Sequence, residues 1–203
     1  MHSFTSAKIR NGRTHDNLNN FQVDEGTDLE KRLKEMIFIS RFMGATSASL
    51  VSANVKLLLD EPVDPQDSVN ELRHIMYAFA ISDEDRCAFE KRFNTRLCDL
   101  WGLTETLGAT TLSPVFRKSR SDSIGVVRPG NEMLVVDEQG GELPPGQEGE
   151  LIVKGVPGRT LMRCYFNDQE LTSRKMRDGW FFTGDIGSMD ADGYFYFSEK
   201  NYS

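Results

Sequence analysis

The stretch TRLCDLWGLTET, residues 95–106, joins a short run that contains Leu97, Cys98 and Leu100 directly to the segment WGLTET. The run TRLCDL (95–100) is predicted to form a short strand. In open α/β sheets, ligands bind beyond the carboxyl ends of the strands, where loops present side chains and backbone groups. Residues 101–106 are therefore predicted to form a ligand-facing loop.

Three side chains of this predicted loop suit a nucleotide. Trp101 offers a face for stacking on a purine, an interaction worth about 1–3 kcal/mol for a base held on an aromatic ring. The Thr104 hydroxyl can donate to a phosphate oxygen, and the Glu105 carboxylate is a ligand that Mg²⁺ prefers. An ordinary strand-to-helix turn, in which Trp101 is simply packed, remains the alternative.

Upstream of this loop the sequence predicts helices. Residues 1–26 show no periodicity and are predicted to be a loose arm, whereas the capping box of Thr27 and Glu30 predicts a helix start. A second helix should end at Glu61-Pro62, because the residue before proline is pushed out of the helical region. The apolar stripe of this second helix consists of Val51, Val55 and Leu58.

A third helix completes the α/β part of the chain. Ser82 with Asp85 predicts its start, and Phe89 and Phe93 fall on one of its faces. Because the strand predicted at 95–100 follows at once, this part of the chain alternates helix with strand.

The second half of the chain is predicted to be mostly β. From Ser123 onward short apolar runs alternate with turn-forming residues, a pattern typical of strands. One helix, with Asp168 as its N-cap, should interrupt them. We therefore divide the chain into an arm (1–26), a partial α/β part (27–122) and a β-rich part (123–203). The predicted strands are MLVV (133–136), ELIVK (150–154), WFFT (180–183) and YFYF (194–197).

A second candidate motif, Thr183-Gly184-Asp185, stands at the end of the WFFT run and before a predicted turn. A carboxylate can accept hydrogen bonds from both hydroxyls of a ribose, and acidic residues do so in many nucleotide sites. The alternative is an ordinary aspartate in a hairpin turn. Two such motifs in one chain favour a nucleotide site more than either does alone.

Composition narrows the possible partners. The net charge of −7 argues against binding to nucleic acid through its phosphate backbone. No run of ten uninterrupted apolar residues occurs, so neither a membrane span nor a secretory signal is expected. Because Cys87, Cys98 and Cys164 lack CxxC spacing, we expect buried structural thiols in a reducing, cytoplasmic setting.

Longer segments resemble those of one enzyme family. LWGLTETLGATT (100–111) resembles the nucleotide-binding core motif of adenylate-forming enzymes, the superfamily of AMP-dependent acyl-CoA synthetases and ligases. SIGVVRPGNEMLVVDEQGGELPPGQEGELIVKG (123–155) resembles the β-rich subdomain that follows this motif, and DGWFFTGDIGSMDADGYFYF (178–197) resembles the ribose-binding segment. The resemblance is continuous from about residue 28 to residue 200.

This resemblance implies roles for the first motif and for Asp185. It implies that Trp101, beside Gly102, stacks on adenine and that Asp185 holds the ribose hydroxyls. It also implies that Thr104 contacts the phosphates and that Glu105 holds Mg²⁺, which makes these two the implied catalytic residues.

Two further places depart from the family pattern. Ala78, Phe79 and Ala80 stand where the family has a Gly-Ala-Pro-like stretch whose backbone contacts adenine, and Phe79 is much larger than the usual residue. Lys200 stands where the family has a ribose-contacting arginine, and a lysine lacks the planar fork of a guanidinium. Both contacts are therefore expected in altered form.

The resemblance also implies a fold and a reaction. The implied fold is the later part of a large N-terminal domain, with an incomplete α/β sandwich followed by a β-rich, distorted-barrel subdomain. The implied reaction uses ATP to join a small carboxylic acid to AMP with loss of pyrophosphate, and then passes the acyl group to CoA. Residues 71–93 and 153–168 resemble those of crotonobetaine/carnitine–CoA ligases, and Thr46, Ser47 and Ser49 are polar, so a small polar acid is expected.

One family element has no counterpart in the sequence. A flexible Gly/Ser/Thr-rich loop ending in lysine normally holds the phosphates, whereas the nearest segment here, GATSAS (44–49), has one glycine and no following lysine. The family's C-terminal domain, with its catalytic lysine, would begin just past Lys200. We therefore expect a ligase fragment that is inactive alone. The alternative is a non-catalytic remnant that binds nucleotide or a partner, including a full-length ligase.

Overall fold

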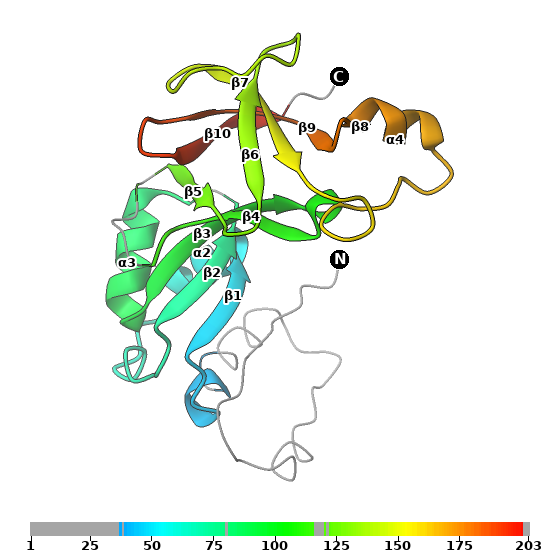
Figure 1. Cartoon of the computed structure of the whole chain (residues 1–203). Coiled ribbons are helices and arrows are strands. Elements are labelled where there is room, and N and C mark those ends of the chain that lie inside the picture. The colour runs from blue at the N-terminus through cyan, green and yellow to red at the C-terminus, as the bar shows by residue number, and fades with distance from the viewer. Residues whose placement is uncertain (1–36, 38, 80, 116–119, 121, 201–203) are drawn as a thin grey trace. The chain divides into compact units, whose positions relative to one another are not determined.

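The computed structural model describes residues 37, 39–79, 81–115, 120 and 122–200. Its chain is divided into two compact units between Leu97 and Cys98, coloured from blue to green and from green to red in Figure 1. The predicted arm and the helix start predicted at Thr27 lie outside the described residues.

The first unit has the predicted α/β character. Strand β1 (Ser47–Val51) runs parallel to β2 (His74–Ala78), and Figure 1 shows them side by side. Helix α2 (Ser52–Asp60) follows β1, and helix α3 (Asp83–Phe93) follows β2. Because parallel strands need cover for their apolar faces, this alternation lets helices supply it.

Local sequence determines where the two helices end and begin. Glu61, which precedes Pro62, is extended with ψ 147°, so α2 stops at the predicted position. The Ser82 hydroxyl accepts a hydrogen bond from the Asp85 backbone N–H at 3.1 Å and caps α3. Both predicted helix boundaries are therefore confirmed.

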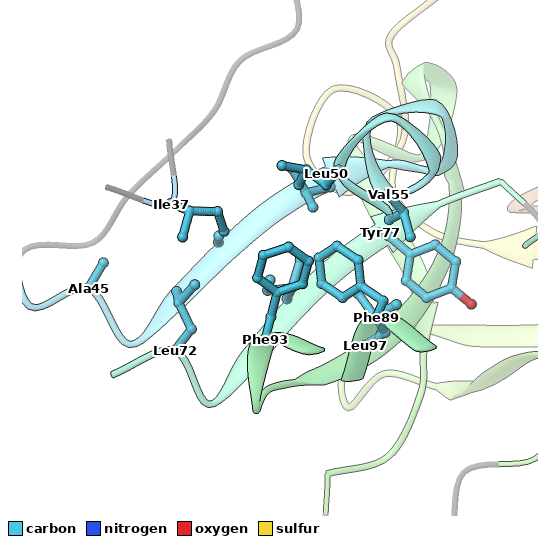
Figure 2. Close-up of a cluster of buried hydrophobic side chains, with 12 residues drawn as sticks. Ile37, Ala45, Leu50, Val55, Leu72, Tyr77, Phe89, Phe93 and Leu97 are labelled. Carbon is cyan, nitrogen blue, oxygen red and sulfur yellow. The ribbon is translucent and has the colours of Figure 1, made fainter. Parts of the chain in front are cut away.

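An aromatic cluster forms the core of the first unit. Phe89 and Phe93, one turn apart on α3, have ring centroids 4.5 Å apart, and Figure 2 shows them between the side chains of Tyr77 and Leu72. Such burial of large side chains contributes most of the stability of a domain of this size. The fully buried members include Val55, Ile75, Tyr77, Phe89 and Leu97.

The second unit is built from antiparallel strands. Its described strands are β3 (Arg96–Leu103, which starts in the first unit), β4 (Gly108–Leu112), β5 (Ser123–Val127), β6 (Glu132–Val136), β7 (Glu148–Lys154), β8 (Met176–Arg177), β9 (Trp180–Met189) and β10 (Tyr194–Lys200). Helix α4 (Gln169–Lys175) is capped by the Asp168 carboxylate, as predicted. The four predicted strands of this half are all present.

These strands form an open sheet in the order β3-β4-β5-β10-β9-β7-β6, with β8 paired to β9. Among the described strands, β6 at one end pairs only with β7. The α/β-plus-β fold class is confirmed, but the expected distorted barrel is not closed here. Closure depends on pairing between distant strands, which local sequence patterns do not specify.

A second apolar cluster lies on this sheet. It contains Trp101, Leu151, Phe181 and Phe195, with Met176 of β8 partly buried against it. The expectation of buried thiols is correct only for Cys98, because Cys87 and Cys164 are exposed. In the described part of the chain, no helix is long and apolar enough to cross a membrane.

Arg120, which lies between β4 and β5 in the sequence, contacts the β9–β10 hairpin. Its guanidinium forms ion pairs with Asp190 and Asp192 and lies over the ring of Tyr194, 4.4 Å from the centroid. Partial burial alone would raise the pKa of the Asp190 carboxyl. Hydrogen bonds from the Tyr194 backbone N–H and the Tyr196 hydroxyl, together with the Arg120 charge, outweigh burial and lower this pKa.

The Asp190→Asn variant should be less stable than the unsubstituted chain at pH 7. A carboxyl whose pKa is lower in the folded state stabilises the fold above its unfolded pKa of about 4, and this stabilisation disappears as the pH falls through the folded pKa. We expect the melting temperature to fall by about 2–4 °C at pH 7. Melting curves at pH 7 and near pH 3 check this, and an equal difference at both would contradict it.

Candidate nucleotide site

The two sequence motifs meet within the second unit. The indole N–H of Trp101 on β3 donates to Oδ2 of Asp185 on β9 at 3.1 Å, although the residues are 84 positions apart. Trp101 is 9% exposed and Asp185 is 3% exposed. The hydrogen bond fixes the carboxylate against the indole edge, which brings an aromatic group and an acidic group to one place.

The sequence had predicted that Asp185 stands before a turn. In the structure it lies instead in a bulged strand. Between the pairs Glu150–Ile186 and Ile152–Phe182, β7 contributes one residue and β9 contributes three. Gly184, the middle residue of these three, has φ 80°, a conformation that glycine adopts without steric cost. The motif thus interrupts the ladder inside β9 (Trp180–Met189).

Thr183 closes the bulge through its hydroxyl. This hydroxyl donates to the Leu151 carbonyl at 2.6 Å and accepts from the Asp185 backbone N–H at 3.0 Å. Thr183 is buried, so both bonds are shielded from water. The Thr-Gly-Asp motif therefore holds the backbone of Asp185 in one conformation.

The first motif is also placed differently from the prediction. Residues 101–103 belong to β3, and Thr104–Thr106 form a single 3₁₀ turn that leads into β4. The strand continues because β4 pairs with it, with Leu103 opposite Gly108. The predicted loop is therefore wrong for residues 101–103, and the connecting turn is confined to Thr104–Thr106 at the tip of a β-hairpin.

Gly102 is required by this hairpin. A Cβ atom at Gly102 would lie 2.1 Å from the Gly108 carbonyl oxygen, which no side chain can tolerate without moving the backbone. Thr106 completes the turn, because its hydroxyl accepts from the Leu103 N–H and donates to the Gly108 carbonyl, both at 2.9 Å. The structure gives Gly102 a packing role, whereas contact with a nucleotide stays a prediction.

Glu105 is held by a residue that the sequence analysis missed. The Tyr165 hydroxyl donates to Oε1 of Glu105 at 2.9 Å, and the Met162 backbone N–H donates to the Glu105 carbonyl at 2.7 Å. Burial, followed by the hydrogen bond to Glu105, raises the pKa of Tyr165 to about 12. This phenol is therefore protonated at neutral pH and remains a donor. No local pattern marks Tyr165, because its partner is 60 residues away.

The side chains of Thr104 and Glu105 fit a magnesium ion that is held jointly by the protein and by substrate phosphates. Thr104 is exposed, and Glu105 is partly exposed. No group of three or more His, Cys, Asp or Glu side chains gathers as a metal site within the described residues. Mg²⁺ is usually bound by one or two carboxylates together with substrate phosphates, so a single accessible carboxylate beside a hydroxyl is consistent with it.

The remaining candidates belong to the first unit or are only partly described. Phe79 follows β2 in the first unit, with φ 74° and 72% exposure, an uncommon conformation for a side chain of this size. Ala78 ends β2, whereas Ala80 lies outside the described residues. Lys200 is the last residue of β10, and its backbone is paired opposite Asp185 on β9.

Comparison with known proteins gives a consistent picture. The family model described as "AMP-binding enzyme" matches residues 27–166. Crotonobetaine/carnitine–CoA ligase of Salmonella typhi is 36% identical over 157 residues, which cover 77% of this chain and 30% of the ligase. The same ligase of Proteus mirabilis is 36% identical over 160 residues with the same coverage. The chain thus spans about a third of the length of these curated relatives.

Solved structures show the same fold. The ATP-bound RpMatB-BxBclM chimera B3 has a TM-score of 0.72 and 26% identity, with 86% of this chain and 33% of the chimera covered. VinN has a TM-score of 0.71 and 28% identity, with 80% of this chain and 42% of VinN covered.

Proposed function

Because the chain belongs to the AMP-binding enzyme family, we propose that it forms the nucleotide-binding part of an AMP-forming acid–CoA ligase. The observation that carries the proposal is the hydrogen bond of 3.1 Å between Trp101 and Asp185, which joins the two candidate nucleotide-binding motifs. In this proposal Asp185 receives the ribose hydroxyls and Trp101 contacts the adenine. Carboxylates bind vicinal hydroxyls well because both oxygens accept hydrogen bonds.

The tip of the β3–β4 hairpin serves the phosphates in the same proposal. The Thr104 hydroxyl donates to a phosphate oxygen, and the Glu105 carboxylate, oriented by Tyr165, is the ligand for Mg²⁺. When bound, the metal ion would neutralise phosphate charge that the protein otherwise has to balance with cationic donors. Gly102 contributes by holding β3 and β4 close together, so that the tip has one shape.

For the acid, we propose a small polar carboxylate of the betaine type. The names of the two curated relatives given above identify them as ligases of crotonobetaine and carnitine. Thr46, Ser47 and Ser49 at the start of β1 are partly exposed polar residues, which suit a polar ligand better than a fatty acyl chain. A full-length ligase carrying this segment should form carnitinyl-CoA faster than palmitoyl-CoA, and the opposite order would reject the proposal.

Calorimetric titration tests the nucleotide proposal on the chain itself. AMP should bind at one site with measurable heat, and CMP should bind more weakly, because a pyrimidine offers a smaller face than a purine for stacking on Trp101. Circular dichroism confirms that the protein is folded in the same sample. A folded chain that takes up no AMP at millimolar concentration would refute the proposal.

A further inference from the structure

Glu150 on β7 holds the bulge that carries Asp185. Its Oε1 accepts a hydrogen bond from the Gly184 backbone N–H at 2.8 Å. Gly184 lies in the stretch where β9 has three residues opposite one of β7, so the regular ladder does not define its N–H partner. A side chain takes the place of a strand carbonyl as acceptor, which keeps this backbone donor satisfied.

The bond at Glu150 and the two bonds of Thr183 fix different ends of the same bulge. Thr183 attaches the bulge to Leu151 and orients the Asp185 N–H, whereas Glu150 fixes the peptide between Thr183 and Gly184. The Asp185 side chain then meets the Trp101 indole N–H. Glu150 is therefore hydrogen-bonded to the backbone of Gly184, the residue that directly precedes Asp185.

We propose that Glu150 is a positioning residue for Asp185 and thereby sets the preference of the site for a ribose with both hydroxyls. This inference rests on the proposed function, because Asp185 is the proposed acceptor of those hydroxyls. Glu150 is partly exposed, and the proposal gives it no direct contact with the nucleotide. Its effect is indirect: without an acceptor for the Gly184 N–H, the glycine at φ 80° can relax and move the carboxylate away from Trp101.

Three substitutions of Glu150 and one control variant separate positioning from general stability. Glu150→Gln retains an oxygen acceptor for the Gly184 N–H, whereas Glu150→Ala removes it. If Glu150→Ala does not fold, Glu150→Met keeps the aliphatic bulk of the side chain and still lacks the acceptor. Glu132→Ala is the matched control, because it removes an exposed carboxylate whose partner is Lys154, away from the bulge.

The first measurement requires no nucleotide. The chain has two tryptophans, so the indole N–H region of an NMR spectrum contains two signals, which Trp101→Phe assigns. Glu150→Ala should shift the Trp101 signal and speed the exchange of this proton with solvent, because Asp185 no longer holds it. Glu150→Gln and Glu132→Ala should leave the signal unchanged. An unchanged Trp101 signal in a folded Glu150→Ala or Glu150→Met protein would overturn the proposal.

The second measurement compares AMP with 2′,3′-dideoxy-AMP by calorimetry. Glu150→Ala should weaken AMP binding about two- to tenfold, the effect of one ordinary hydrogen bond, and leave dideoxy-AMP binding unchanged. Glu150→Gln should restore AMP binding. An equal loss for both ligands would show that Glu150 only stabilises the fold and would reject its positioning role. If the unsubstituted chain binds no AMP, the proposed function fails, and the indole signals still decide whether Glu150 positions Asp185.

Discussion

The 203-residue chain alone, incubated with ATP, Mg²⁺, CoA and a panel of carboxylic acids, should release no pyrophosphate and form no acyl-CoA. Both steps of the proposed reaction move dense negative charge, which needs preorganised cationic and hydrogen-bonding donors. The sequence has no Gly/Ser/Thr-rich loop ending in lysine, and its nearest segment, residues 44–49, has one glycine. Loss of one preorganised donor costs about 10²–10³ in rate, so the loss of several should lower turnover by more than about 10⁴.

Formation of acyl-CoA makes a second demand on the protein. Transfer to CoA requires its thiol to be held close to the acyl group, and such placement is a large share of catalysis. Pyrophosphate release and acyl-CoA formation are both followed, and calorimetry with AMP shows in parallel that the same preparation binds nucleotide. Turnover at the rate of an ordinary acyl-CoA ligase, abolished by Glu105→Ala, would show that the absent loop is dispensable.

Features that depend on neighbours in sequence were predictable. The end of α2 follows from Glu61-Pro62, and the start of α3 follows from the Ser82 cap. The Asp168 cap of α4 was predictable for the same reason. In each case the deciding contact spans at most three or four residues, so the chain needs no distant partner to adopt the structure.

Features that depend on distant strands were not predictable. The motif at residues 101–103 is a strand because β4 pairs with it, and the motif at Asp185 is a bulge because β7 and β9 are out of register there. Tyr165 and Glu150 act on partners 60 and 34 residues away. Periodicity reports only which residues are apolar, so it cannot show which side chain reaches across a sheet.

The Asp185→Ala variant should bind AMP about 10- to 150-fold more weakly than the unsubstituted chain. The change removes hydrogen bonds between a charged acceptor and the ribose hydroxyls, which are worth about 1.5–3 kcal/mol. It also leaves the Trp101 indole N–H, which Asp185 accepts at 3.1 Å, without this acceptor, so melting temperatures must be compared first. Calorimetry with AMP and with 2′,3′-dideoxy-AMP is the measurement.

Comparison of ligands separates ribose recognition from a structural role of Asp185. If the carboxylate holds the hydroxyls, Asp185→Ala lowers AMP affinity and hardly changes dideoxy-AMP affinity. Asp185→Asn retains an oxygen acceptor for Trp101 but loses the charge, so its AMP affinity should be intermediate. Asp178→Asn, at an exposed turn before β9, removes the same charge and should bind AMP normally. A carboxylate that served only to anchor Trp101 would instead give equal losses for both ligands, because the displaced indole would weaken contact with the adenine that they share.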